Sequence, residues 1–366
     1  MVFEQGKFSK PVRYRHHPDD YSRFIAQLRT LRPAHIVMEA TGVYYLDLAV
    51  ALSEAGMPVS VINPKSSKHF AQLKLQNSKT DGIDAALLAE YGARMQPRHW
   101  SAPEPSRQAL RSLGRQINRL IGARTQAKNR LHAMRATRAT PQVLIDDESE
   151  AIATLERRIE RLREAAQALL NELPELKRMH AHCCAAKGIG EATALALLAE
   201  LCVLPEDMKS AQVSRHAGLD VRLHQSGSSV ARKARISKAG NAYLRSALYM
   251  PVMSAVRFDP NAKAFYEALI ARGKTKLQAQ VAVMRKYLTG VWACIRTDSP
   301  FNSDLLFSSQ HAKKDLSGNR VSTKTVSRLQ QCRRLDLCPH RAPRRQLQPV
   351  SRTPRDARQQ RHAAGV

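Results

Sequence analysis

Three carboxylates in this chain have the types and spacing of a metal-binding set. Asp81 and Asp84 open an apolar helical stretch, and Glu39 ends an apolar stretch earlier in the chain. Side chains three apart on a helix share one face, so the two aspartates can direct their carboxylates at one point. Open α/β sheets bind ligands at the carboxyl ends of their strands, where Glu39 can meet them.

Carboxylate oxygens gathered in this way suit Mg²⁺ or Mn²⁺. In phosphoryl transfer, two such ions can activate the attacking oxygen and stabilise the leaving one. A second interpretation is that Asp81 and Asp84 only favour the positive end of a helix that Thr80 caps. Spacing alone favours this capping interpretation.

A second segment combines serine, glycine and basic residues. Ser226 lies in the run Gln-Ser-Gly-Ser-Ser over 225–229, which predicts an exposed loop. Nearby cations could stabilise a serine alkoxide and hold a phosphate, so the segment could carry a nucleophile that attacks DNA. The alternative is a flexible loop that binds backbone phosphates without chemistry. Predicted nucleic-acid contacts in and after the segment are Arg232, Lys233, Arg235, Lys238 and Arg245.

A third segment, Lys-Gly-Ile-Gly over 187–190, predicts a turn that opens a helix. Such a turn presents free backbone N–H groups to an anion. Lys187, Gly188 and Gly190 are therefore predicted nucleic-acid contacts, as in helix-hairpin-helix modules. A tight turn between packed helices explains the same residues equally well.

Alternating strands and helices over residues 1–100 predict an α/β domain with a mostly parallel sheet. The expected strands are 34–39 and 58–62, and a helix is expected from Thr80 to Met95. Heptad runs then predict an antiparallel coiled-coil hairpin over 101–178, whose seams could pack within one chain or between two. Arg124 occupies a seam position, where an acid of the other arm could pair with it.

The remainder divides into a helical segment with loops over 179–307 and a basic tail over 308–366 that lacks an apolar period and is expected to be disordered. The net charge of +28 draws the chain to a polyanion. Nucleic acid is the expected partner, and a membrane surface is the alternative. No apolar run reaches the length of a membrane span. Unpaired cysteine spacing predicts a reducing, cytoplasmic location.

Taken together and in order, these motifs resemble the DEDD transposases of the insertion sequence 110/1111 family. The resemblance covers residues 1–307: its amino-terminal part rests on 37–42, 63–64 and 79–85, and its carboxyl-terminal part on 187–190, 217–219, 225–227 and 235–245. It implies an RNase H-like, resolvase-like first domain whose acids Glu39, Asp81 and Asp84 bind divalent metal. It also implies a mostly α carboxyl-terminal transposase domain in which Ser226 is the nucleophile, with Ser228 and Ser229 as weaker candidates.

The family's first acid lies on a first strand, in a Gly-Ile-Asp-like motif. The chain begins after that point, and residues 1–14 are similar to the strands that follow it, so the metal site is expected to be incomplete. Members move an element by cutting and rejoining DNA as oligomers, and some use an RNA to choose sites. The prediction is therefore a nucleoid-associated, homo-oligomeric DNA recombinase, and the resemblance implies RNA as a further partner that guides it. The alternatives are a nucleic-acid-binding protein that does not cut and a resolvase-like metal nuclease.

Overall fold

The computed structural model describes residues 1–42, 44–226 and 230–311, with side chains described for all of these except 223–226, 230–234 and 308–311. Its contacts separate residues 1–309 from a second unit, 310–366. Nearly all of the predicted basic tail lies outside the described residues. Helix α13 (Ser303–His311) nevertheless continues past residue 307, where the tail was predicted to begin.

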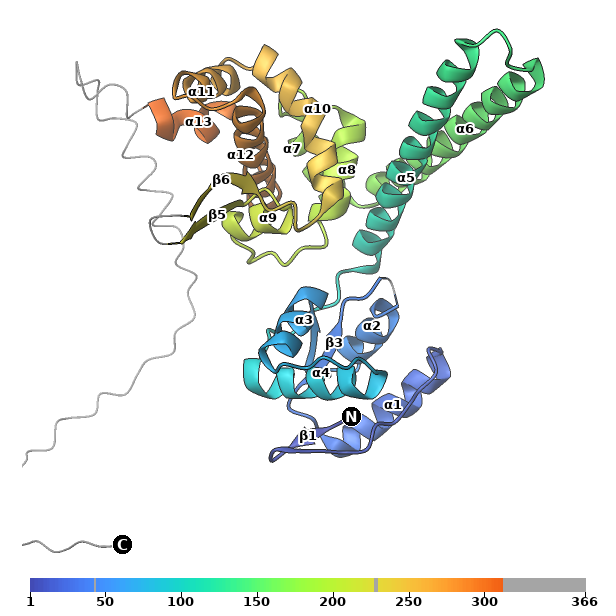
Figure 1. Cartoon of the computed structure of the whole chain (residues 1–366), viewed down its shortest axis with the longest axis vertical. Coiled ribbons are helices and arrows are strands. Elements are labelled where there is room, and N and C mark those ends of the chain that lie inside the picture. The colour runs from blue at the N-terminus through green and yellow to red at the C-terminus, as the bar shows by residue number, and fades with distance from the viewer. Residues whose placement is uncertain (43, 227–229, 312–366) are drawn as a thin grey trace, which may run out of the picture. The chain divides into compact units, whose positions relative to one another are not determined.

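The first part of the chain is an α/β segment (Figure 1). Two very short strands, β1 (Phe3–Glu4) and β2 (Lys7–Phe8), pair antiparallel. The central strands β3 (Ile36–Glu39) and β4 (Val59–Ile62) pair in parallel, with Glu39 opposite Ile62. This confirms the two predicted strands and their parallel pairing.

Four helices accompany these strands. They are α1 (Pro18–Leu31), α2 (Leu46–Glu54), α3 (Pro64–Leu73) and α4 (Asp81–Met95). A small core of Leu28, Leu52 and Val59 joins α1 and α2 to β4. Helix α3 was not predicted, although Asn63 caps it by accepting a hydrogen bond from the Lys65 amide at 2.9 Å. An asparagine before a proline is a helix-start signal, because proline suits the first helical position.

The predicted coiled-coil hairpin is present. Helices α5 (Pro105–Arg135) and α6 (Gln142–Glu172) form two long arms that lie side by side (Figure 1). Their seams pack against each other within one chain, as Ala127, Leu131 and Ile152 form a buried cluster. Arg124 Nη1 lies 3.8 Å from Glu156 Oε1 on the other arm, which confirms the predicted pairing of this seam arginine.

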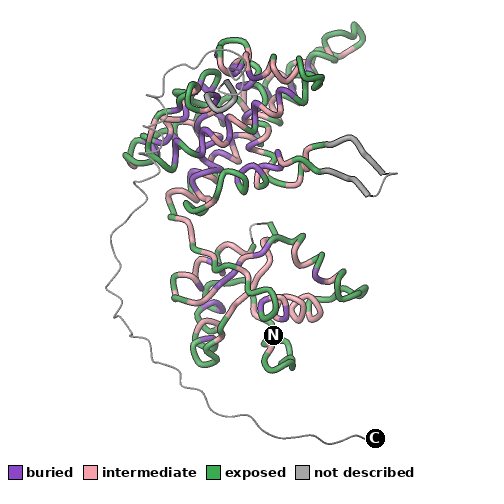
Figure 2. The backbone as a smooth tube through the Cα atoms, turned by 90° about the vertical axis from the view of Figure 1, so that its left-hand side faces the viewer, coloured by how far each residue is buried: buried purple, intermediate pink, exposed green. Residues whose placement is uncertain are grey.

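The helices that follow share one large core with the base of the hairpin. They are α7 (Pro174–Cys184), α8 (Glu191–Leu201), α9 (Ser210–His216), α10 (Ala242–Phe258), α11 (Pro260–Ala271) and α12 (Lys276–Thr297). Buried residues concentrate here, whereas most of the α/β segment is exposed or only partly buried (Figure 2). Trp292 and Tyr287 are among the largest fully buried side chains.

One element of this region was not predicted. Strands β5 (Val221–Ser226) and β6 (Val230–Ile236) form an antiparallel hairpin where helices and loops were expected. Among the described residues, no helix combines the length and the apolar character that crossing a membrane requires.

Candidate functional site

Glu39 is a positioned carboxylate at the end of β3. Its Oε1 accepts a hydrogen bond from the Thr41 hydroxyl at 2.7 Å, and its Oε2 accepts one from the Ser67 hydroxyl of α3. Two hydroxyl donors on two different elements therefore fix the plane of the carboxylate. Both oxygens keep lone pairs for a further ligand, because a carboxylate has about four acceptor sites.

Asp81 and Asp84 lie in the first turn of α4. The Thr80 hydroxyl caps this helix by accepting from the Ile83 amide at 3.3 Å, so the predicted cap is present. Asp81 is almost fully exposed and its nearest ionic partner is Arg13, with Nη2 3.9 Å from Oδ2. Water screens such an exposed pair strongly, so Asp81 remains available to another cation.

Helix α4 packs against β3, the strand that ends at Glu39. The chain that follows α4 reaches the start of β4, since the Trp100 amide donates to the carbonyl of Val59, the first residue of β4. Within the helix, Gly92 packs against Val37, where an added Cβ would meet a side-chain carbon at 2.7 Å. At 1.5 Å per helical residue, Asp84 lies about 12 Å along the axis from Gly92, the residue of α4 that packs on β3.

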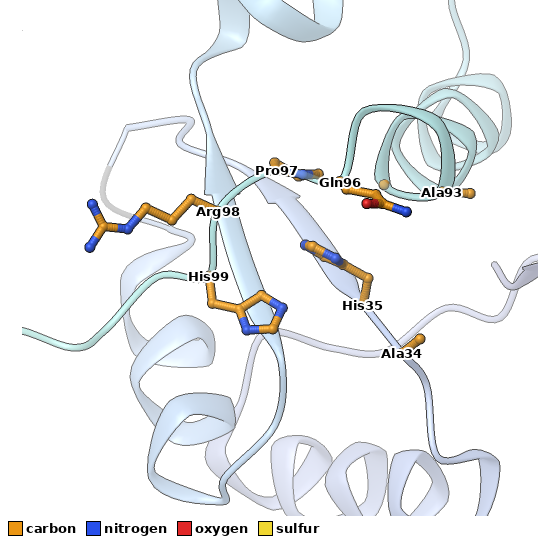
Figure 3. Close-up of a pocket in the computed structure, with 8 residues that line it drawn as sticks. Ala34, His35, Ala93, Gln96, Pro97, Arg98 and His99 are labelled. Atoms are coloured by element: carbon orange, nitrogen blue, oxygen red, sulfur yellow. The ribbon is translucent and has the colours of Figure 1, made fainter. Parts of the chain in front are cut away.

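A cavity of about 550 Å³ opens at the opposite edge of this sheet (Figure 3). The imidazoles of His35 and His99 meet there edge to face, with ring centroids 4.9 Å apart, while Arg98 points away from them. His35 Nε2 lies 2.6 Å from the Ser60 hydroxyl. Burial, together with the charge of His99, lowers the pKa of His35. No carboxylate lines this cavity, so it is distinct from the Glu39 edge.

Ser226 is the last residue of β5 and pairs with Val230 of β6. The hairpin is strongly basic: Arg235 lies directly opposite Arg222, both exposed, and Arg232 and Lys233 follow one another on β6. Like charges directly opposite each other destabilise a bare ladder. A polyanion bound to the hairpin would remove that repulsion. Ser228 and Ser229 lie outside the described residues.

The predicted basic contacts that follow the hairpin differ in availability. Lys238 is exposed, on a left-handed backbone turn with φ of 49°. Arg245 is half-buried, and its Nη1 donates to the carbonyls of Ala217 at 2.8 Å and Asn241 at 3.3 Å. Its guanidinium thus links the segment that precedes β5 to the segment that follows β6.

The glycine turn between α7 and α8 is built for close packing. Gly188 has φ of +88°, and a Cβ there would lie 2.3 Å from the carbonyl oxygen of Pro251 in α10. Gly190 precedes α8 as its N-cap, with open space around it, and Lys187 is exposed. Packing alone accounts for Gly188, whereas Lys187 and the backbone at Gly190 remain free to contact an anion.

Alanine at Gly188 is expected to destabilise the protein by more than about 2 kcal/mol, from the left-handed backbone and the clash combined. Gly190→Ala, in the same turn but at negative φ, should cost less than about 1 kcal/mol. Chemical denaturation of both variants checks this. Equal losses in the two would contradict the packing explanation.

Comparison with known proteins matches two segments of the chain. A family model described as "Transposase" matches residues 1–136, and one described as "Transposase IS116/IS110/IS902 family" matches 183–267. The pilin gene-inverting protein of Moraxella lacunata is 33% identical over 282 residues, covering 73% of this chain and 82% of that protein. The chain belongs to the insertion sequence 110/1111 family of transposases.

More distant relatives agree. A probable family 20 transposase of Pseudomonas aeruginosa is 26% identical over 303 residues, covering 74% of this chain and 86% of its own length. The transposase of insertion sequence element IS1111A from Coxiella burnetii is 25% identical over 303 residues, covering 75% and 81%. The two matched segments of this transposase contain the Glu39 edge and the Ser226 hairpin.

A DEDD-type transposase implies a divalent metal. The oxygen donors of Glu39, Asp81 and Asp84 suit such an ion. Among the described residues, however, no group of three or more His, Cys, Asp or Glu side chains could hold a metal ion. The donor chemistry fits, but the three carboxylates do not converge.

Sequence reasoning missed a buried charged cluster in this transposase. Glu200 of α8 is 2% exposed and accepts from Arg115 of α5 at 2.6 and 2.9 Å and from the Asn241 amide at 2.6 Å. Arg111 lies 3.5 Å away. His216 also has a buried Nε2 that lacks a hydrogen-bond partner among the described residues. The sequence signal that could have revealed this cluster is the single acid, Glu200, near the end of the apolar run of α8.

Proposed function

We propose that this transposase moves an insertion sequence by cutting and rejoining DNA, with Ser226 as nucleophile and Glu39, Asp81 and Asp84 as ligands of Mg²⁺ or Mn²⁺. The observation that supports it is the place of Ser226, at the end of a strand in a hairpin whose partner strand carries Arg232, Lys233 and Arg235. These cations lie in sequence and in strand register close to Ser226, where a phosphate would have to bind. The α/β segment is proposed to be RNase H-like, with domains at 1–100, 101–178 and 179–307.

The serine step is a phosphoryl transfer. Ser226 Oγ attacks a backbone phosphorus, the hydroxyl proton passes to a base or solvent, and the bond to the leaving deoxyribose oxygen breaks. The released oxygen takes up a proton. A hydroxyl of the new partner strand then attacks the phosphoserine diester, which restores the serine and joins the strands. The bound metal would supply positive charge for the oxygens that gain negative charge.

Assembly and target choice are further parts of this proposal. The chain is proposed to act as a homo-oligomer through the α5–α6 hairpin, and an element-encoded RNA is proposed to direct it to sites. Because the apolar seam of the hairpin is occupied within one chain, a second copy would contact another face. Val143 and Leu144 near the hairpin tip are exposed apolar side chains suited to such a contact.

The metal proposal is tested with supercoiled DNA that carries the element ends, incubated with the candidate RNA and Mg²⁺. Asp84→Asn and Glu39→Gln are expected to lower strand cutting at least about 100-fold, since weaker changes to the groups around a metal already cost 10- to 100-fold. Chelation by EDTA should abolish cutting, and added Mn²⁺ should restore it. Asp47→Asn, in the first turn of α2, is the matched control and should cut normally.

The outcomes separate the three interpretations. Cutting that survives both EDTA and Asp84→Asn would contradict the metal ligands proposed here. Metal-dependent cutting without a covalent adduct would favour a resolvase-like nuclease. DNA binding without cutting under every condition would leave a binding protein. Affinity should fall steeply with salt in all three cases, so salt dependence does not distinguish them.

A further inference from the structure

A basic recess lies between α9 and α12, and it does not include residues of the serine hairpin. The cavity has a volume of about 440 Å³. Its polar lining comes from Ser210 and Ser214 of α9 and from Arg285, Lys286 and Thr289 of α12. Apolar side chains of α11 and α13, including Phe265, form the remaining walls. Neither the proposed chemistry nor the predicted nucleic-acid contacts use these residues.

No carboxylate of the described residues compensates the positive charge of this recess. Two cations line it and no acidic side chain does. Arg285 is exposed and has no ion pair within the described part of the chain. Lys286 is half-buried: its Nζ donates to the carbonyl of Leu306 at 2.9 Å and lies 5.6 Å from the ring centroids of Phe265 and Phe307. Burial lowers the pKa of Lys286, an effect that a bound anion would oppose.

A buried hydroxyl in the same lining lacks a partner. Ser214 is only 1% exposed, and its Oγ makes no hydrogen bond to any described residue. Buried polar atoms are almost always paired, so an unpaired one requires an explanation. A serine hydroxyl can donate to an anion oxygen. An anion that reached this hydroxyl from the recess would satisfy it and would lie in the cavity that Arg285 and Lys286 also line.

We infer that the recess between α9 and α12 binds a backbone phosphate of nucleic acid through Arg285, Lys286 and Ser214. A phosphodiester fits better than a small free anion, because the apolar lining residues Ala211, Ala282 and Leu306 offer a surface to the adjoining sugar. Tetrahedral oxygens can accept from a guanidinium, an ammonium and a hydroxyl at the same time.

The recess is close in sequence to the proposed nucleophile. Helix α9 leads within a few residues into β5, the strand that ends at Ser226. A phosphate held against α9 would fix the register of a nucleic-acid strand on the segment that carries the proposed nucleophile. The inference concerns binding alone and stands whether or not Ser226 cuts DNA.

The test measures affinity of the full-length protein for labelled duplex DNA over a range of KCl concentrations. Each phosphate neutralised contributes about 0.9 to the slope of log affinity against log salt on duplex DNA. Arg285→Gln is expected to reduce this slope by about that amount. Lys274→Gln is the matched control, since it removes one exposed cation of the same region that does not line the recess.

Ser214→Ala provides a second signature. It removes a neutral donor, so affinity should fall about threefold to tenfold while the salt slope stays unchanged. Circular dichroism verifies that the near-isosteric variant is folded. Arg285→Gln and Lys274→Gln with equal slopes and affinities would overturn the inference, because a diffuse basic surface gives that result. A Ser214→Ala variant with wild-type affinity for every probe would also overturn it.

Two further probes identify the source of the phosphate. The same variants are titrated with an RNA hairpin, and a loss with DNA, with RNA or with both supports the recess and names its ligand. Inorganic phosphate, compared with chloride at equal ionic strength, should raise the thermal midpoint of wild type more than that of Ser214→Ala. An equal rise in both would count against the site. Adduct formation by Ser226, measured separately, is expected to persist at high protein concentration in Arg285→Gln.

Discussion

Alanine at position 226 is expected to abolish the covalent protein–DNA adduct, with a loss of at least about 1,000-fold in strand cutting, while DNA affinity changes less than about twofold. The reason is that the serine oxygen forms a bond to phosphorus, whereas binding rests on the surrounding cations. A nucleophile removed without a substitute leaves only positioning and electrostatics to accelerate the reaction. Denaturing gel electrophoresis of labelled DNA measures the adduct, and fluorescence anisotropy measures affinity.

The controls use the same short segment. Ser228→Ala and Ser229→Ala change neighbouring hydroxyls and should leave the adduct intact. Mass spectrometry of the adduct peptide then locates the bond directly. An adduct that maps to either neighbour, or that forms at full yield in Ser226→Ala, would sink the role proposed for Ser226. Loss of DNA affinity together with the adduct would instead indicate damage to the hairpin.

A converse change separates chemistry from binding. Replacing Arg222 with glutamine removes the like-charge pair opposite Arg235 and leaves Ser226 in place. If the hairpin exists to hold a polyanion, this variant should bind DNA more weakly and still form the adduct at saturating DNA. The contrast with Ser226→Ala would then assign nucleophile and phosphate contacts to different residues of one hairpin.

Short-range sequence patterns predicted the elements that are decided by neighbouring residues. The Thr80 cap and the two acids after it placed the start of α4 correctly, because capping is decided by a few adjacent residues. The heptads predicted α5 and α6, since a sustained period of apolar residues specifies a seam. The β5–β6 hairpin escaped prediction because only Val221 and Leu223 are apolar in β5 and three basic residues interrupt β6.

Sequence reasoning could not predict the geometry of the candidate metal site. Spacing established that Asp81 and Asp84 begin one helix and that Glu39 ends a strand. It could not establish whether the three carboxylates converge, because that depends on how α4 packs across β3, and in the structure they do not. The Glu200 cluster was missed for the same reason, since its partners lie far away in the sequence.

Alanine at Glu200 is expected to destabilise the protein by about 3–5 kcal/mol, the usual cost of removing one member of a buried ion pair. The variant would leave Arg115 and the neighbouring Arg111 facing each other without their shared carboxylate. It would also release the Asn241 side chain, which caps α10 by accepting from the Tyr243 amide at 2.9 Å. Denaturant unfolding measures the loss, and Glu164→Ala, an exposed acid on α6, should change stability by less than about 0.5 kcal/mol.

The same carboxylate predicts a dependence on pH. Burial acts to raise the pKa of Glu200, but the hydrogen bond from Arg115 and the charges of Arg111 and Arg115 outweigh it and leave the pKa below its usual value. A lowered pKa means that the folded state binds this proton less readily than the unfolded state. The stabilisation is therefore complete above the ordinary glutamate value of about 4.3 and is lost as the pH falls through the lower folded value.

Glu200→Gln separates charge from shape in this cluster. Glutamine keeps the size of the side chain and one acceptor oxygen, so it should cost less than alanine, and its stability should vary less with pH below about 4.3 than that of wild type. An unchanged dependence of stability on acid pH would contradict a charged Glu200 at the centre of the cluster.

Because Asn241 directly follows the loop that leaves β6, either variant should also slow adduct formation at Ser226 at saturating DNA. Glu164→Ala should not, which would show that the buried carboxylate positions the hairpin as well as stabilising the core.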